Sequence, residues 1–293
     1  MTATPSPGRL SLPKAIGWSV AFVVLTLFLA TLMGVGTAAL LSGSVRRGAE
    51  WLSQVTAGPI LLQAVVTILA GLLFTWLLGM RVLHLTPADL RWTIPPTRLG
   101  FGAGVLGGCT VAGLALLLGV LAGHARWVPD AGTGPEYAGS AFKTVLVLAP
   151  SALAEELIFR GVPLVLLAAV AGRGTAIGVV ALAFALAHLN NPNVTALGLG
   201  NIALAGVLLG LAFYAPGGLW TATGVHLGWN ALLACLDTPV SGLPFRIPML
   251  DYRAGGPAWL TGGGFGPEGG LAATVAMTLG IVLARRWAGK DVT

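Results

Sequence analysis

Long uncharged segments alternate with short polar ones along most of the chain. A helix needs about 20 mainly apolar residues, at 1.5 Å each, to cross the hydrocarbon core of a bilayer. Five segments are long enough to span it, namely 15–41, 58–80, 99–123, 142–169 and 217–236. Three shorter segments can span if flanking arginines reach toward the head groups, namely 174–189, 197–215 and 270–287.

Each of these segments is expected to be helical, because an isolated strand in lipid leaves its backbone groups unpaired. The pattern therefore predicts an all-α, polytopic membrane protein with about eight transmembrane helices, forming a single integral membrane domain over 1–293. Residues 237–270 interrupt the pattern with nine glycines and five prolines. This composition predicts a long surface loop without regular structure, and we favour a passive connector over a gate.

The composition agrees with this interpretation. Apolar residues make up 56% of the chain and charged residues 9%, whereas a soluble domain is about one quarter charged. Too few polar residues are present to cover an aqueous surface, which excludes a soluble enzyme and a disordered chain. The net charge of +6 is spread over single or paired basic residues, so no nucleic-acid partner is expected. Cys109 and Cys235 lack CxxC spacing and predict neither a disulfide framework nor a metal site.

Basic residues in the loops predict the orientation. With eight crossings, both termini lie on one side, which carries nine cations: Arg9, Lys14, Arg81, Arg91, Arg98, Arg173, Arg285, Arg286 and Lys290. The opposite side carries six: Arg46, Arg47, Arg126, Lys143, Arg246 and Arg253. Because cytoplasmic loops are enriched in lysine and arginine, we expect the termini to be cytoplasmic.

Pairs of glycines four residues apart predict close helix packing. These pairs are Gly104/Gly108, Gly119/Gly123, Gly174/Gly178 and Gly206/Gly210. Small residues at this spacing let two helix backbones approach each other in lipid. We expect the contacts to form within the chain rather than between copies.

Ionisable side chains inside the apolar segments identify a candidate site, because each costs about 2.5–3.5 kcal/mol at the centre of a membrane. Segment 142–169 carries Glu155, Glu156 and Arg160. Glu156 and Arg160 are four residues apart and share a helix face, whereas Glu155 points about 100° away. We therefore expect Arg160 to neutralise Glu156 and Glu155 to face a cavity.

Two later segments carry His188, and His226 with Asn230 one helical turn beyond it. A lone histidine in a membrane is usually a hydrogen-bonding group between helices, and a Glu–Arg pair is often structural. Three segments nevertheless each supply groups suited to activating water or holding an oxyanion. This combination favours one shared hydrolytic site.

The motifs Glu155-Glu156-x-x-x-Arg160, Phe184-x-x-x-His188 and His226-x-x-x-Asn230 resemble, in order, the three motifs of the CAAX protease and bacteriocin-processing family. The resemblance implies an all-helical intramembrane glutamic endopeptidase whose catalytic helices, within 142–236, enclose a cavity open to the cytosol. It assigns water activation to Glu155 and His188, the oxyanion to His226 and Asn230, and supporting roles to Glu156 and Arg160. The implied partners are the lipid bilayer and a prenylated (CAAX) or hydrophobic peptide, cleaved near its C-terminus.

Three alternatives stay open. Two histidines and a glutamate can bind a catalytic zinc, so a zinc-dependent metalloprotease is the alternative to the cofactor-free reaction that we favour. The sequence has no HExxH motif, which counts against zinc. A proton-coupled transporter also explains buried titratable groups, although it gives no reason for Asn230 one turn beyond His226. A non-catalytic membrane scaffold would use the polar cluster only to fix the helix register.

Overall fold

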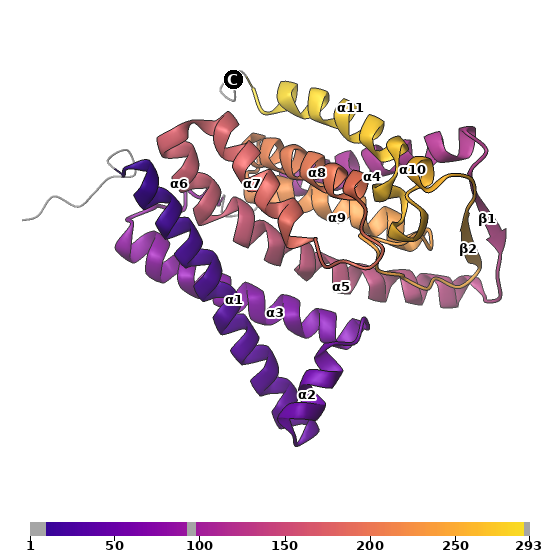
Figure 1. Ribbon diagram of the computed structural model, residues 1–293, viewed down its shortest axis with the longest axis horizontal. Coiled ribbons are helices and arrows are strands. Elements are labelled where there is room, and N and C mark those ends of the chain that lie inside the picture. Colours follow the sequence, from indigo (N-terminus) through magenta and orange to yellow (C-terminus); the bar gives the residue numbers. More distant parts are fainter. Residues whose placement is uncertain (1–9, 93–97, 290–293) are drawn as a thin grey trace, which may run out of the picture. The chain divides into compact units, whose positions relative to one another are not determined.

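The structure, a computed structural model, describes residues 10–92 and 98–289 (Figure 1). Helices form most of it, which confirms the predicted all-α class. Contacts divide the chain into two compact units, the first made of Met1–Thr93 with Val147–Ala176 and the second of Ile94–Leu146 with Ile177–Thr293. The single domain over 1–293 stays a prediction.

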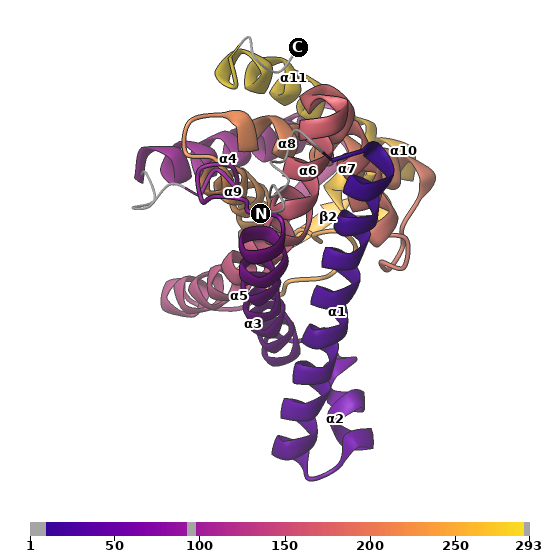
Figure 2. The ribbon, with the colours of Figure 1, turned by 90° about the vertical axis from the view of Figure 1, so that its left-hand side faces the viewer.

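The first unit is built on a long helical hairpin. Helix α1 (Leu12–Ser42) packs against α3 (Ala57–Phe74), and the short helix α2 (Val45–Leu52) joins them at one end (Figure 2). A π-helical segment, Thr75–Val82, extends α3, and α6 (Val162–Ala171) packs on α1. The apolar core of this unit includes Phe22, Leu90, Val162 and Leu166.

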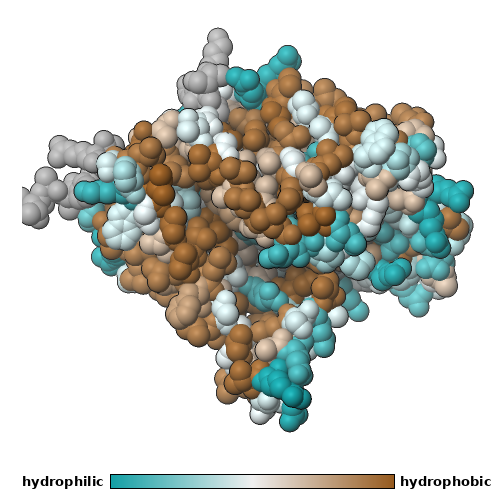
Figure 3. All heavy atoms as spheres, viewed as in Figure 1, coloured by the Kyte–Doolittle hydropathy of each residue, from teal (hydrophilic) through white to brown (hydrophobic). Residues whose placement is uncertain are grey.

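The surface of α1 is apolar along its length. Its exposed large hydrophobic side chains include Ile16, Val20, Val24, Phe28 and Leu32. Figure 3 shows hydrophobic residues over α1 and hydrophilic ones gathered at the end that carries α2. These exposed apolar side chains are suited to contact with lipid. A helix of 31 residues is also long enough to span the hydrocarbon core of a bilayer.

Four helical spans in the described residues are long and apolar enough to cross a membrane: Leu12–Ser42, Ala57–Val82, Gly100–Leu121 and Ala196–Tyr214. They correspond to three of the clear predicted segments and to one of the shorter ones. The protein is therefore an integral membrane protein, while eight crossings and cytoplasmic termini stay predictions. Arg9 and Lys290, which contribute to the predicted orientation, lie outside the described residues.

The predicted crossing 142–169 is not one helix. Helix α5 (Gly134–Arg160) ends at the last residue of the first motif, and α6 begins at Val162. Pro163 causes the break, because proline has no backbone N–H and its ring clashes with the preceding turn. The residue between the helices, Gly161, has no room for a side chain, since a Cβ there would lie 2.4 Å from the carbonyl oxygen of Leu157.

In the second unit, helices α4 (Arg98–Leu121) and α9 (Leu219–Cys235) pack backbone against backbone. A Cβ at Gly108 would lie 2.1 Å from the carbonyl oxygen of Val225, and one at Gly228 would lie 2.1 Å from that of Val105. Gly104 and Gly224 meet the facing helix in the same way. The predicted intramolecular packing of Gly104/Gly108 is therefore confirmed.

The other glycine pairs give a mixed result. Gly206 and Gly210 of α8 (Ala196–Tyr214) contact Ala181 and Ile177 of α7 (Arg173–Ala187), as expected for a close helix pair. A Cβ at Gly123 or Gly178, by contrast, would meet no atom within 4 Å. The prediction therefore fails for Gly123 and Gly178, whereas a Cβ at Gly119 would lie 3.2 Å from the Cβ of Ala125.

The expectation of an irregular loop holds for 237–249 but was wrong for 250–270. Strand β2 (Leu250–Ala254) pairs antiparallel with β1 (Ala125–Pro129), and three short helices follow, namely α10 (Ala258–Thr261), η3 (Gly263–Phe265) and η4 (Pro267–Gly269). Most of residues 265–270 is buried. The glycines permit this compact path, because Gly262 has φ +84° and a Cβ there would lie 1.7 Å from the carbonyl oxygen of Gly266.

Candidate functional site

The first motif lies at the C-terminal end of α5 and forms an ion pair. Nη1 of the Arg160 guanidinium lies 3.1 Å from Oε1 of Glu156, and both side chains are fully buried. The predicted neutralisation of Glu156 by Arg160 is confirmed. Glu155 is partly buried and points to another side of the helix, as its 100° offset requires. Its convergence with the two histidines stays a prediction.

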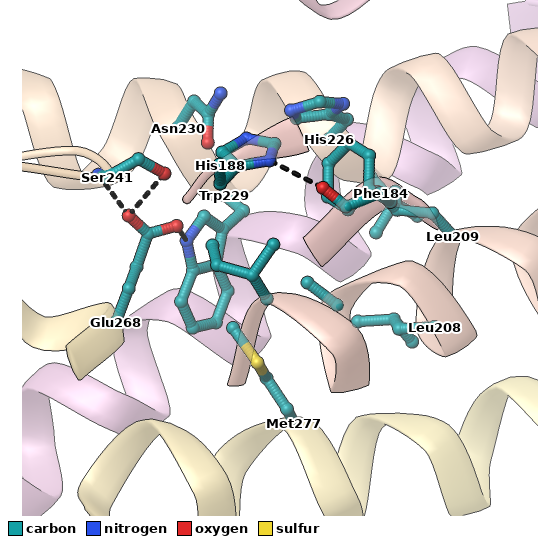
Figure 4. A pocket seen from close by; sticks show the side chains of 13 residues that line it. Phe184, His188, Leu208, Leu209, His226, Trp229, Asn230, Ser241, Glu268 and Met277 are labelled. Atoms are coloured by element: carbon teal, nitrogen blue, oxygen red, sulfur yellow. Dashed lines mark hydrogen bonds between the residues drawn. The ribbon is translucent and has the colours of Figure 1, made fainter. Parts of the chain in front are cut away.

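The second and third motifs meet in one pocket of the second unit (Figure 4). His188, His226 and Asn230 all line it, together with apolar residues from α8, α9 and α11 (Leu271–Trp287). The cavity has a volume of about 30 Å³. A cavity of this size holds at least one water molecule, provided that polar groups are present to bind it.

His188 follows directly after α7, where the last carbonyl groups of the helix lack partners within it. Its Nδ1 lies 2.7 Å from the carbonyl oxygen of Phe184, one turn earlier. Because a carbonyl oxygen only accepts hydrogen bonds, Nδ1 of the neutral ring carries the hydrogen and Nε2 is an acceptor. The spacing of the second motif thus fixes the tautomer of its histidine.

Phe184 also contacts the histidine of the third motif. Its ring centroid lies 4.7 Å from that of His188 and 6.0 Å from that of His226, with an edge-to-face arrangement to His226. His226 and Asn230 are one turn apart on α9, so both reach the same pocket. The close packing of α9 on α4 fixes the position of the helix backbone that carries these two side chains.

A carboxyl group that no motif includes also lines this pocket. Glu268, in η4, is 3% exposed. Its Oε1 accepts a hydrogen bond from Nε1 of Trp229 at 2.9 Å, and its Oε2 accepts from the backbone N–H and the hydroxyl of Ser241. Burial raises the pKa of Glu268, whereas the hydrogen bonds from Ser241 and Trp229 counteract part of this rise.

Asn201 of α8 fixes the backbone around Glu268. Its side-chain nitrogen donates to the carbonyl oxygens of Glu268 and Gly270 at 2.7 and 2.9 Å, and its side-chain oxygen accepts from the hydroxyl of Thr274 at 2.7 Å. Sequence reasoning missed both residues. A signal existed for Asn201, because it is a lone amide in an apolar helix, and such groups bond across helices.

In the described part of the chain, no group of three His, Cys, Asp or Glu side chains is placed to hold one metal ion. The choice between a zinc-dependent and a cofactor-free reaction stays a matter for experiment. The polar groups of the pocket are suited to binding water. Two imidazoles, an amide and a carboxyl group surround a space of the size of a water molecule.

Fold and pocket together define a helical membrane protein with a buried polar site that suits hydrolysis. Residues 138–232 match the family described as type II CAAX prenyl endopeptidase Rce1-like. This segment includes all three motifs, so the family resemblance deduced from them is confirmed. Neither the curated proteins nor the solved structures include a match.

Proposed function

We propose that this protein is an intramembrane endopeptidase that hydrolyses peptide bonds with an activated water molecule and without a metal. One observation carries the proposal. His188, His226 and Asn230, from two motifs of an endopeptidase family, line one partly open pocket that has room for water.

In the proposed reaction, Nε2 of His188 takes one proton from the attacking water, and the carboxylate of Glu155 assists by stabilising the positive charge that the ring gains. The acceptor character of Nε2 in His188, set by the bond from Nδ1 to Phe184, supports this role. The water oxygen bonds to the carbonyl carbon, the C–N bond breaks, and the proton passes to the leaving amine. His226 and Asn230 donate hydrogen bonds to the carbonyl oxygen as it becomes negative, and one such donor contributes about 2.7–4 kcal/mol.

The proposed substrates are prenylated or otherwise hydrophobic peptides, cleaved near their C-terminus. The family description names CAAX prenyl endopeptidases. The apolar lining of the pocket, which includes Ile202, Leu208, Leu209 and Met277, supports a hydrophobic substrate. The apolar surface of α1 places the protein in lipid, where prenylated chain ends are concentrated.

Product identification tests this function. Purified protein in detergent is incubated with matched prenylated and unprenylated peptides, and the fragments are identified by mass spectrometry. We expect defined cleavage by the wild type and none by Glu155→Ala or His188→Ala. Glu50→Ala is the matched control, because this carboxylate is exposed and forms a surface ion pair with Arg46, and we expect the variant to cleave normally. Proton or ion flux in liposomes without peptide products would instead identify a transporter.

Chelation tests the metal-free part of the proposal. We expect cleavage to survive exhaustive chelation, and the active protein to contain no stoichiometric metal by elemental analysis. Loss of cleavage with recovery on adding zinc would establish the metalloprotease alternative.

A further inference from the structure

Glu268 has one hydrogen-bonding position that the described residues do not use. An ionised carboxylate accepts about four hydrogen bonds. The hydroxyl and backbone N–H of Ser241 use two positions at Oε2, and the indole of Trp229 uses one at Oε1. The second position of Oε1 is left, on a side chain that lines the pocket with His188 (Figure 4).

An attacking water needs acceptors for both of its hydrogens. When both O–H groups are held, the lone pairs of the oxygen are directed away from these acceptors and can point toward the substrate carbonyl. His188 offers Nε2 as one acceptor. In the proposed reaction Asn230 and His226 donate to the oxyanion, whereas an ionised carboxylate can only accept.

We propose that Glu268 is a further catalytic residue, whose Oε1 accepts a hydrogen bond from the attacking water and so directs its lone pair at the substrate. The inference rests on the proposed function. One water proton goes to Nε2 of His188, assisted by Glu155, and then to the leaving amine. The other hydrogen, held by Glu268, stays on the oxygen and ends on the new carboxyl group. Glu268 itself is unchanged.

The carboxylate is fixed in place before substrate binds. Asn201 holds the backbone carbonyl of Glu268 at 2.7 Å, and Asn191 donates to the carbonyl oxygen of Ser241 at 3.0 Å. The indole of Trp229 links the carboxylate directly to α9, the helix that carries His226 and Asn230. A hydrogen-bond acceptor held in this way needs no reorganisation during the reaction.

Glu268→Gln tests the inference with little change in shape. The glutamine oxygen satisfies both donors of Ser241 only if its NH₂ group takes the place of Oε1, where it also loses the hydrogen bond from the indole N–H of Trp229. The NH₂ group would donate to the water instead of accepting from it. We expect kcat to fall about 100-fold, the loss typical of a misplaced reactant. KM should stay within about twofold, because the substrate contacts are unchanged.

Ser241→Ala is the matched control. It removes one hydrogen bond to Oε2 and keeps Oε1 and the negative charge. We expect kcat within about fivefold of the wild type, since the acceptor for water is intact. If Glu268 only fastened the segment, both variants would lose stability and activity together. Equal kcat for Glu268→Gln and wild type would overturn the proposal.

A second measurement does not depend on a folded variant or on activity. An experimental structure of the wild type that resolves water should show one molecule within about 3.2 Å of both Oε1 of Glu268 and Nε2 of His188. A pocket with no water at Oε1 would overturn the inference even if peptides are cleaved. Water at this position in a protein that cleaves no peptide would leave the water site intact and refute the proposed function alone.

Discussion

Substitution of Gly108 by alanine tests how the pocket is held in place. The Cβ of alanine would lie 2.1 Å from the carbonyl oxygen of Val225, about 1.3 Å short of the 3.4 Å at which ordinary contact begins. The atoms of α9 that this Cβ would approach all belong to the backbone, so the overlap cannot be relieved by rotation of a side chain. Helices α4 and α9 must separate, and α9 carries His226, Trp229 and Asn230.

The expected cost follows from this overlap. Overpacking of a tight interface typically destabilises by about 1–3 kcal/mol. A displacement of about 1 Å in a catalytic group can lower turnover about 100-fold. Gly108→Ala should therefore reduce both the thermal stability and the cleavage rate.

Gly107→Ala is the matched control on the same helix. A Cβ at Gly107 would meet no atom within 4 Å, and alanine is favoured over glycine in a helix by about 0.8–1.0 kcal/mol. Because alanine gains this propensity at both positions, the two variants should differ by the overpacking cost alone, about 1–3 kcal/mol in stability. The assay is thermal unfolding of both variants in the same detergent, monitored by intrinsic tryptophan fluorescence. A Gly108→Ala protein that unfolds at or above the temperature of Gly107→Ala would refute the close backbone packing.

Three further predictions concern other buried polar groups. Arg160→Leu should destabilise the protein by about 3–5 kcal/mol, because it leaves Glu156 charged and buried, and the double variant with Glu156→Leu should recover most of this loss in the same unfolding assay. Asn201→Ala removes three hydrogen bonds and should cost about 2–4 kcal/mol. Hydrogen exchange by mass spectrometry should then rise in 262–270, and unchanged protection would contradict the anchoring role. Asn230→Ala should lower turnover about 10²–10³-fold if its amide binds the oxyanion, whereas unchanged turnover would remove it from the site.

The positions of the long helices could be predicted from the sequence, because lipid allows only helices over apolar segments of this length. The predicted segments 15–41, 58–80 and 99–123 agree with the observed helices to within a few residues. The spacing of Glu156 and Arg160 also predicted their ion pair, since it depends only on helix periodicity. Local rules were sufficient in these cases.

Features that depend on distant partners could not be predicted in this way. Glycine and proline in 237–270 indicated turns, but their local signal does not tell an exposed loop from a compact, buried one. Glu268 follows no helical spacing, and its burial arises from Ser241, Trp229 and Asn201, which are far away in sequence. The break after Arg160 was the exception, because Pro163 gave a local signal that the apolar length of 142–169 obscured.

The most direct test of the account is the source of the oxygen in the cleaved product. Purified protein is incubated with a prenylated peptide in ¹⁸O-labelled water, and the new C-terminal carboxyl group is analysed by mass spectrometry. The account predicts one ¹⁸O atom in that group for the wild type, and no product for His188→Ala. Product formed at the same rate by His188→Ala, or no cleavage of any peptide by the wild type, would contradict it.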